Sequence, residues 1–258
     1  MTSLAPAAHV FWRNWLVYRR IWHRSIVFGF LQPLMFLSAM GIGMGALLAN
    51  NPTAFGDLTY LEFLGPGLLA ASGMQLATFE STYPIMNKIM WGRNYEAMLS
   101  TPLGTRHILL GELGWISFRI ATIATVFLIV LWIMGVIASP LAVLAVPVAV
   151  LSGLGFSAAL IGFTTTQQND LGFTWIFRFL INPLFLFSDT FFPLSQLPQG
   201  LLVVAWATPL FHAVELIRGL VLNRLDPVTA PLHLAYLLVF AVIVVWLADR
   251  GLARWMAK

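Results

Sequence analysis

The sequence contains no cysteine and very little charge. Of its 258 residues only 9% are Asp, Glu, Lys or Arg, whereas roughly a quarter of a soluble domain is charged. The lack of cysteine excludes disulfides, thiol catalysis, iron–sulfur clusters and cysteine-ligated zinc. Because 59% of the residues are hydrophobic and the mean hydropathy is +0.85, the composition excludes a water-soluble fold and predicts an integral membrane protein.

The sequence also lacks the short motifs of catalysis and nucleotide binding. The dipeptide Gly-Lys does not occur, which excludes a Walker A phosphate loop, and neither H-E-x-x-H nor G-x-S-x-G is found. The five histidines are scattered without a close pair, so we expect no metal site, no catalytic residue and no cofactor bound by this chain. We attribute the net charge of +4 to cationic loops on the cytoplasmic side of a membrane, not to nucleic-acid binding.

Long runs with few charges predict six membrane-spanning helices, because a helix needs about 20 mostly apolar residues to cross a bilayer. They are expected at residues 25–49, 61–86, 108–135, 141–165, 171–188 and 229–248. Basic residues cluster before residue 25, between residues 88 and 106, and after residue 249. The positive-inside rule places all three clusters in the cytoplasm, so both termini lie there and the number of spans is even.

Residues 190–223 are also largely apolar, but Pro193, Pro198 and Pro209 interrupt them. Each interior proline costs a continuous helix roughly 3 kcal/mol or more. We therefore expect a broken, re-entrant helical hairpin on the outer side, between the fifth and sixth spans, with its break at Thr208. It is either a structural plug or a gate at the outer leaflet. The expected fold is an all-α integral membrane protein with one transmembrane domain over residues 1–258.

Two further helices are expected at the cytoplasmic surface. Residues 7–24 combine aromatic side chains at spacings of three to four with arginines on the other face, which is typical of an amphipathic helix in the headgroup plane. Residues 94–101 predict a short amphipathic helix, with Asn94 as its cap and Pro102 as its stop. This helix either docks in a groove on a soluble partner or is an inert connector, and its residues alone favour neither.

Four charged residues fall inside predicted spans: Glu80, Glu112, Arg119 and Arg178. Ionisable groups are costly there and face protein or water. Glu112 and Arg119 share one helix face but lie about 10 Å apart along the axis, too far for a direct pair. Either Glu112 pairs with Arg178 or Glu80 pairs with Arg119. For these four residues, ion pairs that fix the register of the helices are favoured over a proton relay. In the outer hairpin, Glu215 and Arg218 are three residues apart on one helix and can also pair.

Two segments carry a family resemblance. The first runs Glu96-Ala-Met-Leu-Ser-Thr-Pro102-Leu103 and is followed by Gly111-Glu112. The second runs Phe187-Ser-Asp-Thr-Phe-Phe-Pro193 and is followed by Leu197-Pro198, Pro209-Leu210 and Glu215-Leu-Ile-Arg218. Together they resemble the permease of type-2 ABC exporters, a family that includes nodulation-type lipooligosaccharide exporters and daunorubicin-resistance exporters. The segment Phe63-Leu-Gly-Pro-Gly67 and Trp115 resemble the nodulation-type branch, whereas Asp189 stands where family members often have glycine.

The resemblance implies roles for two sets of residues and for residues 7–24, which correspond to an interfacial connecting helix. The implied coupling helix, which seats in a separate ATPase subunit, comprises Asn94, Tyr95, Glu96, Met98, Leu99, Ser100, Thr101 and Pro102. The implied outer gate comprises Ser188, Asp189, Pro193, Pro198, Pro209, Glu215 and Arg218.

The resemblance further implies an exporter built from two permeases, identical or paralogous, and two ABC ATPase subunits that bind ATP and magnesium. Surrounded by membrane lipids, it would move a hydrophobic drug or a lipid-linked substrate outward across the bacterial cytoplasmic membrane. The first alternative is a proton-coupled secondary transporter that depends on Glu80 or Glu112. The second is a polytopic lipid-modifying enzyme, although no cluster of His, Asp or Ser motifs supports it.

Overall fold

The structure is a computed structural model that describes residues 5–45, 55, 57–194 and 199–256. Every regular element within these residues is helical. In chain order the elements are α1 (Ala5–Tyr18), α2 (Trp22–Leu37), η1 (Ser38–Met44), α4 (Tyr60–Ser81), α5 (Tyr83–Met86), η3 (Asn87–Trp91), α6 (Asn94–Leu99), α7 (Thr105–Ile133), η4 (Pro140–Leu144), α8 (Ala145–Thr164), α9 (Leu171–Ile176), η5 (Phe177–Ile181), α10 (Asn182–Phe187), α11 (Gln199–Trp206), α12 (Pro209–Val221) and α13 (Ala230–Met256). The segments η1, η3 and η5 are π-helical, and η4 is a 3₁₀ helix.

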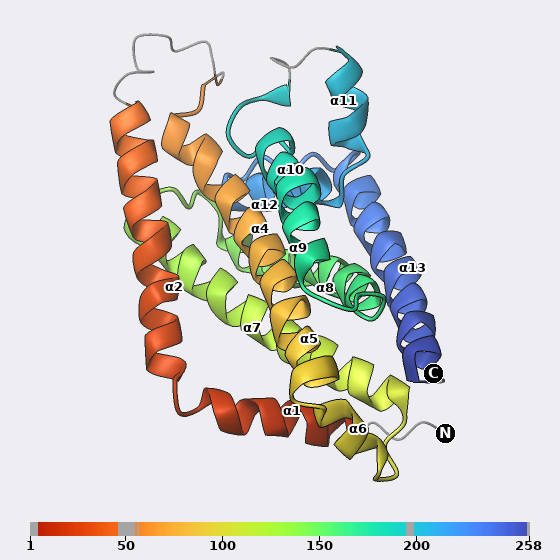
Figure 1. Cartoon of the computed structure of the whole chain (residues 1–258). Coiled ribbons are helices and arrows are strands. Elements are labelled where there is room, and N and C mark those ends of the chain that lie inside the picture. Colours follow the sequence, from red (N-terminus) through yellow and green to blue (C-terminus); the bar gives the residue numbers. More distant parts are fainter. Residues whose placement is uncertain (1–4, 46–54, 56, 195–198, 257–258) are drawn as a thin grey trace.

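The helices form a bundle whose two ends differ (Figure 1). α1 lies across one end, close to α6, and the last turns of α13 reach the same end. α11 lies at the opposite end. We refer to these as the α6 end and the α11 end. Between them, α8 packs against α4, α7 and α13 at the centre of the bundle. Small buried residues of α8, among them Gly153, Ser157 and Ala158, let the neighbouring helices approach closely.

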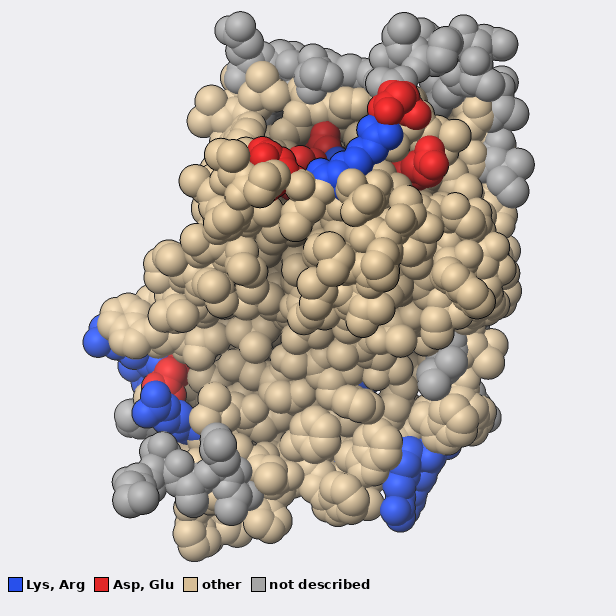
Figure 2. Space-filling view, turned by 180° about the vertical axis from the view of Figure 1, so that it is seen from behind, with Lys and Arg blue, Asp and Glu red and all other residues tan. Residues whose placement is uncertain are grey.

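Three helical segments within the described residues are long and apolar enough to cross a membrane: 105–133, 140–164 and 230–255. They coincide with the predicted third, fourth and sixth spans. The continuous apolar segment 171–187 is shorter and coincides with the predicted fifth span. Charged side chains gather near both ends of the molecule, and the broad belt between them shows almost none on this face (Figure 2). This distribution fits an integral membrane protein.

Local capping explains where several helices begin. At the start of α4, the Thr59 backbone N–H donates to Glu62 Oε2 at 2.8 Å, and the Glu62 N–H donates to the Thr59 hydroxyl at 3.3 Å. This reciprocal capping box satisfies two N–H groups at the helix start. At the start of α12, the Phe211 N–H donates to the Thr208 hydroxyl at 3.3 Å. Pro209 occupies the first turn of α12, where its missing N–H costs nothing.

Several predicted boundaries are corrected. The N-terminal helix ends at Tyr18, so residues 22–24 belong to α2. The predicted second span breaks at Thr82, before Pro84, into α4 and α5. Asn94 does not cap α6: Arg93 precedes the helix in a left-handed conformation with φ of 46°, and no side chain caps it. The predicted end of the first span at residue 49 lies outside the described residues.

Candidate functional site

A buried carboxylate, that of Glu112, lies near the start of α7 at the α6 end. Its side chain is only 2% exposed, and Oε2 lies 2.6 Å from Nζ of Lys88 in η3. Nδ2 of Asn14 in α1 donates to the same oxygen at 3.0 Å. Gly111 allows α1 to lie this close, because a Cβ added there would meet Cβ of Val10 at 2.5 Å. Glu112 therefore joins three separate elements.

Tyr95 of α6 is buried near the same carboxylate. Its ring is 1% exposed. Burial and the nearby negative charge of Glu112 raise the pKa of the Tyr95 hydroxyl well above its ordinary value. The Tyr95 side chain is therefore buried close to the Glu112 carboxylate. We refer to Asn14, Lys88, Tyr95 and Glu112 as the Glu112 cluster.

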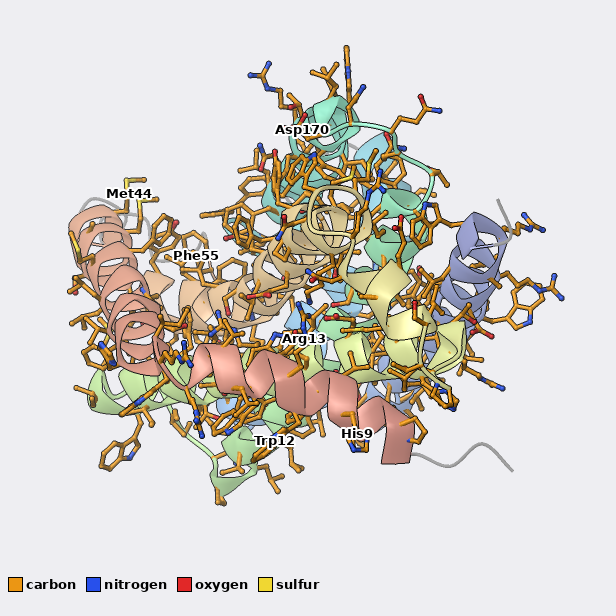
Figure 3. The ribbon with its side chains drawn as sticks, turned by 60° about the horizontal axis from the view of Figure 1, so that its bottom comes forward. His9, Trp12, Arg13, Met44, Phe55 and Asp170 are labelled. Atoms are coloured by element: carbon orange, nitrogen blue, oxygen red, sulfur yellow. The ribbon has the colours of Figure 1, made fainter. Side chains whose placement is uncertain are left out.

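The two faces of α6 have different surroundings. The shared face predicted for Tyr95, Met98 and Leu99 is turned toward the bundle, where Met98 and Leu99 pack against the core. The other side of the segment is exposed and consists of Glu96, Ala97, Ser100, Thr101 and Pro102. α1 runs along the same end of the molecule, with His9, Trp12 and Arg13 labelled on it (Figure 3). The polar face of α6 is therefore the one that faces away from the bundle.

Arg119 and Glu80 form an ion pair between α7 and α4, with Nη2 and Oε1 3.3 Å apart. Arg119 Nη1 also donates to the Ser25 hydroxyl at 2.7 Å, and the guanidinium lies over the Tyr18 ring. One of the two open pairings is thus confirmed. The other is wrong, because Glu112 pairs with Lys88 and not with Arg178. Arg178 is exposed on η5, without an ion pair in the part of the chain that the structure describes.

Arg218 of α12 connects three elements near the α11 end. Its guanidinium forms an ion pair with Asp189, which follows α10, and its Nη1 lies 2.9 Å from Glu215 Oε1. Nη2 donates to the backbone carbonyls of Asp189 at 2.6 Å and of Phe63 in α4 at 3.4 Å. The guanidinium also lies 4.0 Å from the centre of the Phe63 ring. The predicted Glu215–Arg218 pair is confirmed. We refer to Phe63, Asp189, Glu215 and Arg218 as the Arg218 cluster.

The backbone around Asp189 is unusual. Asp189 has a φ of 61°, in the left-handed region, and its Oδ1 accepts from the Leu194 N–H at 2.7 Å. The segment also lies close against α4, because a Cβ added to Gly67 would meet Cα of Thr190 at 3.1 Å. Ser188 and Thr208 share a hydrogen bond of 3.0 Å between their hydroxyls. Pro193 is half-buried beside this segment, and Pro198 lies outside the described residues.

Two histidines that are isolated in the sequence meet in space. Nδ1 of His212 in α12 lies 2.7 Å from Nδ1 of His233 in α13, and Nε2 of His212 lies 2.9 Å from the Trp206 carbonyl. Because a carbonyl only accepts, His212 carries its hydrogen on Nε2, and its Nδ1 accepts from His233. The Tyr236 hydroxyl donates to the Ala207 carbonyl at 2.6 Å. The sequence gives no sign of this contact, because the two histidines lie 21 residues apart. No group of three or more metal-ligating side chains occurs within the described residues.

Sequence reasoning misses four residues that make such contacts. The sequence marks Lys88 only as a cytoplasmic charge, and Asn14 only as part of an amphipathic helix. Asp57 and Arg224 form an exposed bidentate pair near the α11 end, with both N–O distances 2.6 Å. No local motif identifies these partners, since they are far apart in the chain. Only the rule that a buried charge needs a partner predicts that some cation approaches Glu112.

Comparison with protein families identifies the chain. The family described as ABC-2 type transporter matches residues 7–222, which include both charged clusters. The chain belongs to the ABC-2 type transporter family. As an ABC-2 type permease it is the membrane component of a transporter, and the resemblance to type-2 ABC exporter permeases is confirmed.

Several relatives of this ABC-2 permease are named Nodulation protein J. The one from Sinorhizobium fredii (strain NBRC 101917 / NGR234) is 30% identical over 242 residues, covering 94% of this chain and 90% of the relative. The one from Rhizobium meliloti (strain 1021) is 29% identical with the same coverage. A third, from Bradyrhizobium diazoefficiens, is 30% identical and covers 93% of this chain and 92% of the relative. The resemblance to the nodulation-type branch agrees with these relatives.

Proposed function

We propose that this permease is the membrane subunit of an ATP-driven exporter that moves an amphipathic or lipid-linked substrate outward across a bacterial cytoplasmic membrane. The working unit contains two ABC ATPase subunits, which bind ATP and magnesium, and a second permease, identical or paralogous. The family match over residues 7–222 supports the transporter role. The nodulation-type resemblance supports a lipooligosaccharide or a similar glycolipid as the substrate.

The proposed topology has six spans, with the α6 end in the cytoplasm and the α11 end outside. Basic residues support this orientation: α1 and its following turn, η3, the segment around α6 and the end of α13 carry Arg13, Arg19, Arg20, Lys88, Arg93, Arg106, Arg250 and Arg254. Near the α11 end, Arg218 and Arg224 are both paired with acids. Cationic segments are retained on the cytoplasmic side, so the distribution favours this orientation.

Coupling to the ATPase is assigned to α6. The helix is tied to the permease by the buried Tyr95 ring and the Glu112 cluster, and its exposed face is free to meet a soluble subunit. Glu112 also receives hydrogen bonds from α1 and η3. A displacement of α6 by the ATPase therefore acts directly on the start of α7. This arrangement is the observation that carries the proposal of an ATP-driven permease.

The exposed carboxylate of Glu96 provides the test. Its side chain is 55% exposed, so Glu96→Lys reverses a charge on the docking face without removing a buried contact. We expect this variant to insert normally, to lose ATPase co-purification and to lose ATP-driven export. Ala97→Trp, which adds bulk at an exposed position, should have the same effect. Asp170→Lys, an exposed charge reversal outside α6, is the matched control. Normal co-purification and export in both α6 variants would contradict the coupling assignment.

A proton-coupled transporter is the alternative to be distinguished. Such a transporter needs an acid that is free to bind and release a proton. Glu80 and Glu112 are both paired with cations, which favours a structural role for each. Export by cells that lack the ATPase subunit, together with its loss after addition of a proton uncoupler, would favour the alternative.

A further inference from the structure

A cleft of about 480 Å³ opens between α2, α4, α7 and α10, and its lining residues belong to neither charged cluster. Its volume falls within the range of small-molecule sites, which are mostly apolar with a few polar groups. Its walls include the apolar residues Phe36, Leu68, Phe127 and Phe185. Its polar lining residues are Ser25, Ser72, Gln75 and Arg119. The cleft is therefore amphipathic.

The polar lining residues lie nearer the α6 end of the cleft than the aromatic lining residues do. α2 runs from the α6 end toward the α11 end, and α4 runs in the opposite direction (Figure 1). On α2, Ser25 lies about 16 Å closer to the α6 end than Phe36. On α4, Gln75 lies closer to the α6 end than Leu68, by about 10 Å. On α7, Arg119 precedes Phe127. On each of these three helices a polar lining residue thus lies nearer the α6 end than an apolar one, and Leu76 lines the cleft next to Gln75.

The polar end of the cleft is electrically balanced. The positive charge of Arg119 is matched by Glu80 at 3.3 Å, so an anion gains no net attraction there. Gln75 is exposed, and no hydrogen bond to its amide is found within the described residues. An amide offers both donors and an acceptor, as does the hydroxyl of Ser25. Groups that both donate and accept, such as hydroxyls and amides, match this set better than a phosphate or an ammonium.

We propose that this cleft binds one amphiphile whose uncharged head carries hydroxyl or amide groups. The head lies at Gln75, Ser25 and Arg119, and the apolar chain extends toward Phe36 and Phe127. The physiological role rests on the proposed function: with the α6 end in the cytoplasm, the bound molecule has the orientation of a lipid in the inner leaflet. The cleft then serves as the loading site, formed within a single permease chain.

The test compares three surfactants that share a dodecyl chain and differ in their heads. The full chain is purified in a weakly bound zwitterionic detergent and titrated separately with dodecyl maltoside, dodecyl phosphate and dodecyltrimethylammonium. Native mass spectrometry then counts the molecules retained. We expect one dodecyl maltoside per chain at the lowest concentration. Gln75→Leu, which removes the amide at similar volume, should weaken this binding about fivefold, as expected for the loss of one hydrogen bond.

Two further variants make the test specific. Thr125→Val removes an exposed hydroxyl from α7 outside the cleft and should leave binding unchanged. Leu76→Trp fills the cleft and should abolish retention, with an unchanged thermal midpoint as the check on folding. The inference would be overturned if the chain preferred dodecyl phosphate or the ammonium surfactant. It would also be overturned if the Gln75→Leu and Thr125→Val variants bound dodecyl maltoside equally well.

The binding measurement needs no ATPase, so its outcome is separable from that of the proposed function. Cleft binding without ATP-driven export would leave this inference standing and refute the exporter. Normal export by a chain that retains no dodecyl maltoside in the cleft would refute this inference alone.

Discussion

Replacement of Arg218 tests whether the Arg218 cluster holds the α11 end together. The Arg218 side chain is 11% exposed and that of Asp189 is 9% exposed, so both charges are largely removed from water. Arg218→Met keeps most of the side-chain volume and leaves Asp189 without its cation. Removal of one partner from a buried ion pair costs about 3–5 kcal/mol, because the other charge stays buried and unpaired.

This cost predicts a large change in thermal stability. For chains of about this size, 1 kcal/mol changes the unfolding midpoint by roughly 2–4 °C. Arg218→Met should therefore lower the midpoint of the purified permease by about 6–20 °C. The matched control is Arg224→Met, because Arg224 and Asp57 are 47% and 76% exposed. Exposed pairs often contribute nothing measurable, so the control midpoint should not change.

The double variant Arg218→Met/Asp189→Gly distinguishes the ion pair from other losses. It removes the stranded carboxylate together with its partner, so its midpoint should lie above that of Arg218→Met alone. Tryptophan fluorescence during heating, in one detergent for all variants, supplies the measurement. A double variant less stable than the single, or an equal loss in Arg224→Met, would refute the assignment of this stability to a buried ion pair.

The other predictions concern topology, the coupling helix and the paired histidines. Gly200→Cys should react with an impermeant thiol reagent added outside cells, and Thr101→Cys should react only after permeabilisation. The reverse pattern would contradict the proposed orientation. The chain has no native cysteine that could react with the reagent. Tyr95→Ala should lower the free energy of unfolding by about 3–5 kcal/mol, because it removes a buried ring. Tyr95→Phe keeps the ring and should cost far less. Equal losses in the two variants would argue that the Tyr95 ring does not anchor α6. Acidification from about pH 7.5 to 5.5 should lower the unfolding midpoint, because protonated His212 has no acceptor nitrogen for the hydrogen bond from His233. The variant His233→Phe lacks this hydrogen bond, so its midpoint should depend less on pH.

Features that depend on neighbouring residues could be predicted from the sequence. The long apolar runs predict the positions of α7, α8 and α13 to within a few residues, apart from the longer C-terminal end of α13. The break between α11 and α12 follows from Pro209, which fits the first turn of a helix and not its interior. The pair between Glu215 and Arg218 follows from their spacing of three on one helix. Each of these rests on helix geometry alone.

Contacts between distant segments could not be predicted in the same way. Lys88 and Glu112 are 24 residues apart, and His212 and His233 are 21 apart. Which cation approaches a buried acid depends on how α1, η3 and α7 pack, and apolar periodicity does not determine that packing. The amphipathic pattern of α6 likewise shows that one face is apolar. It does not show whether that face meets a partner or, as the structure has it, the body of the permease.

Asp189 shows how a residue with a side chain can fit a backbone conformation that favours glycine. Its φ of 61° favours glycine, because a left-handed conformation costs a residue with a Cβ roughly 1–2 kcal/mol, with Asp and Asn among the most tolerant. In this chain the carboxylate gains an ion pair with Arg218 and accepts from the Leu194 N–H. The ion pair contributes to offsetting the backbone cost only while Arg218 is present. The residues at positions 189 and 218 therefore act as a unit, and an aspartate at 189 is tolerated because α12 supplies its counter-charge.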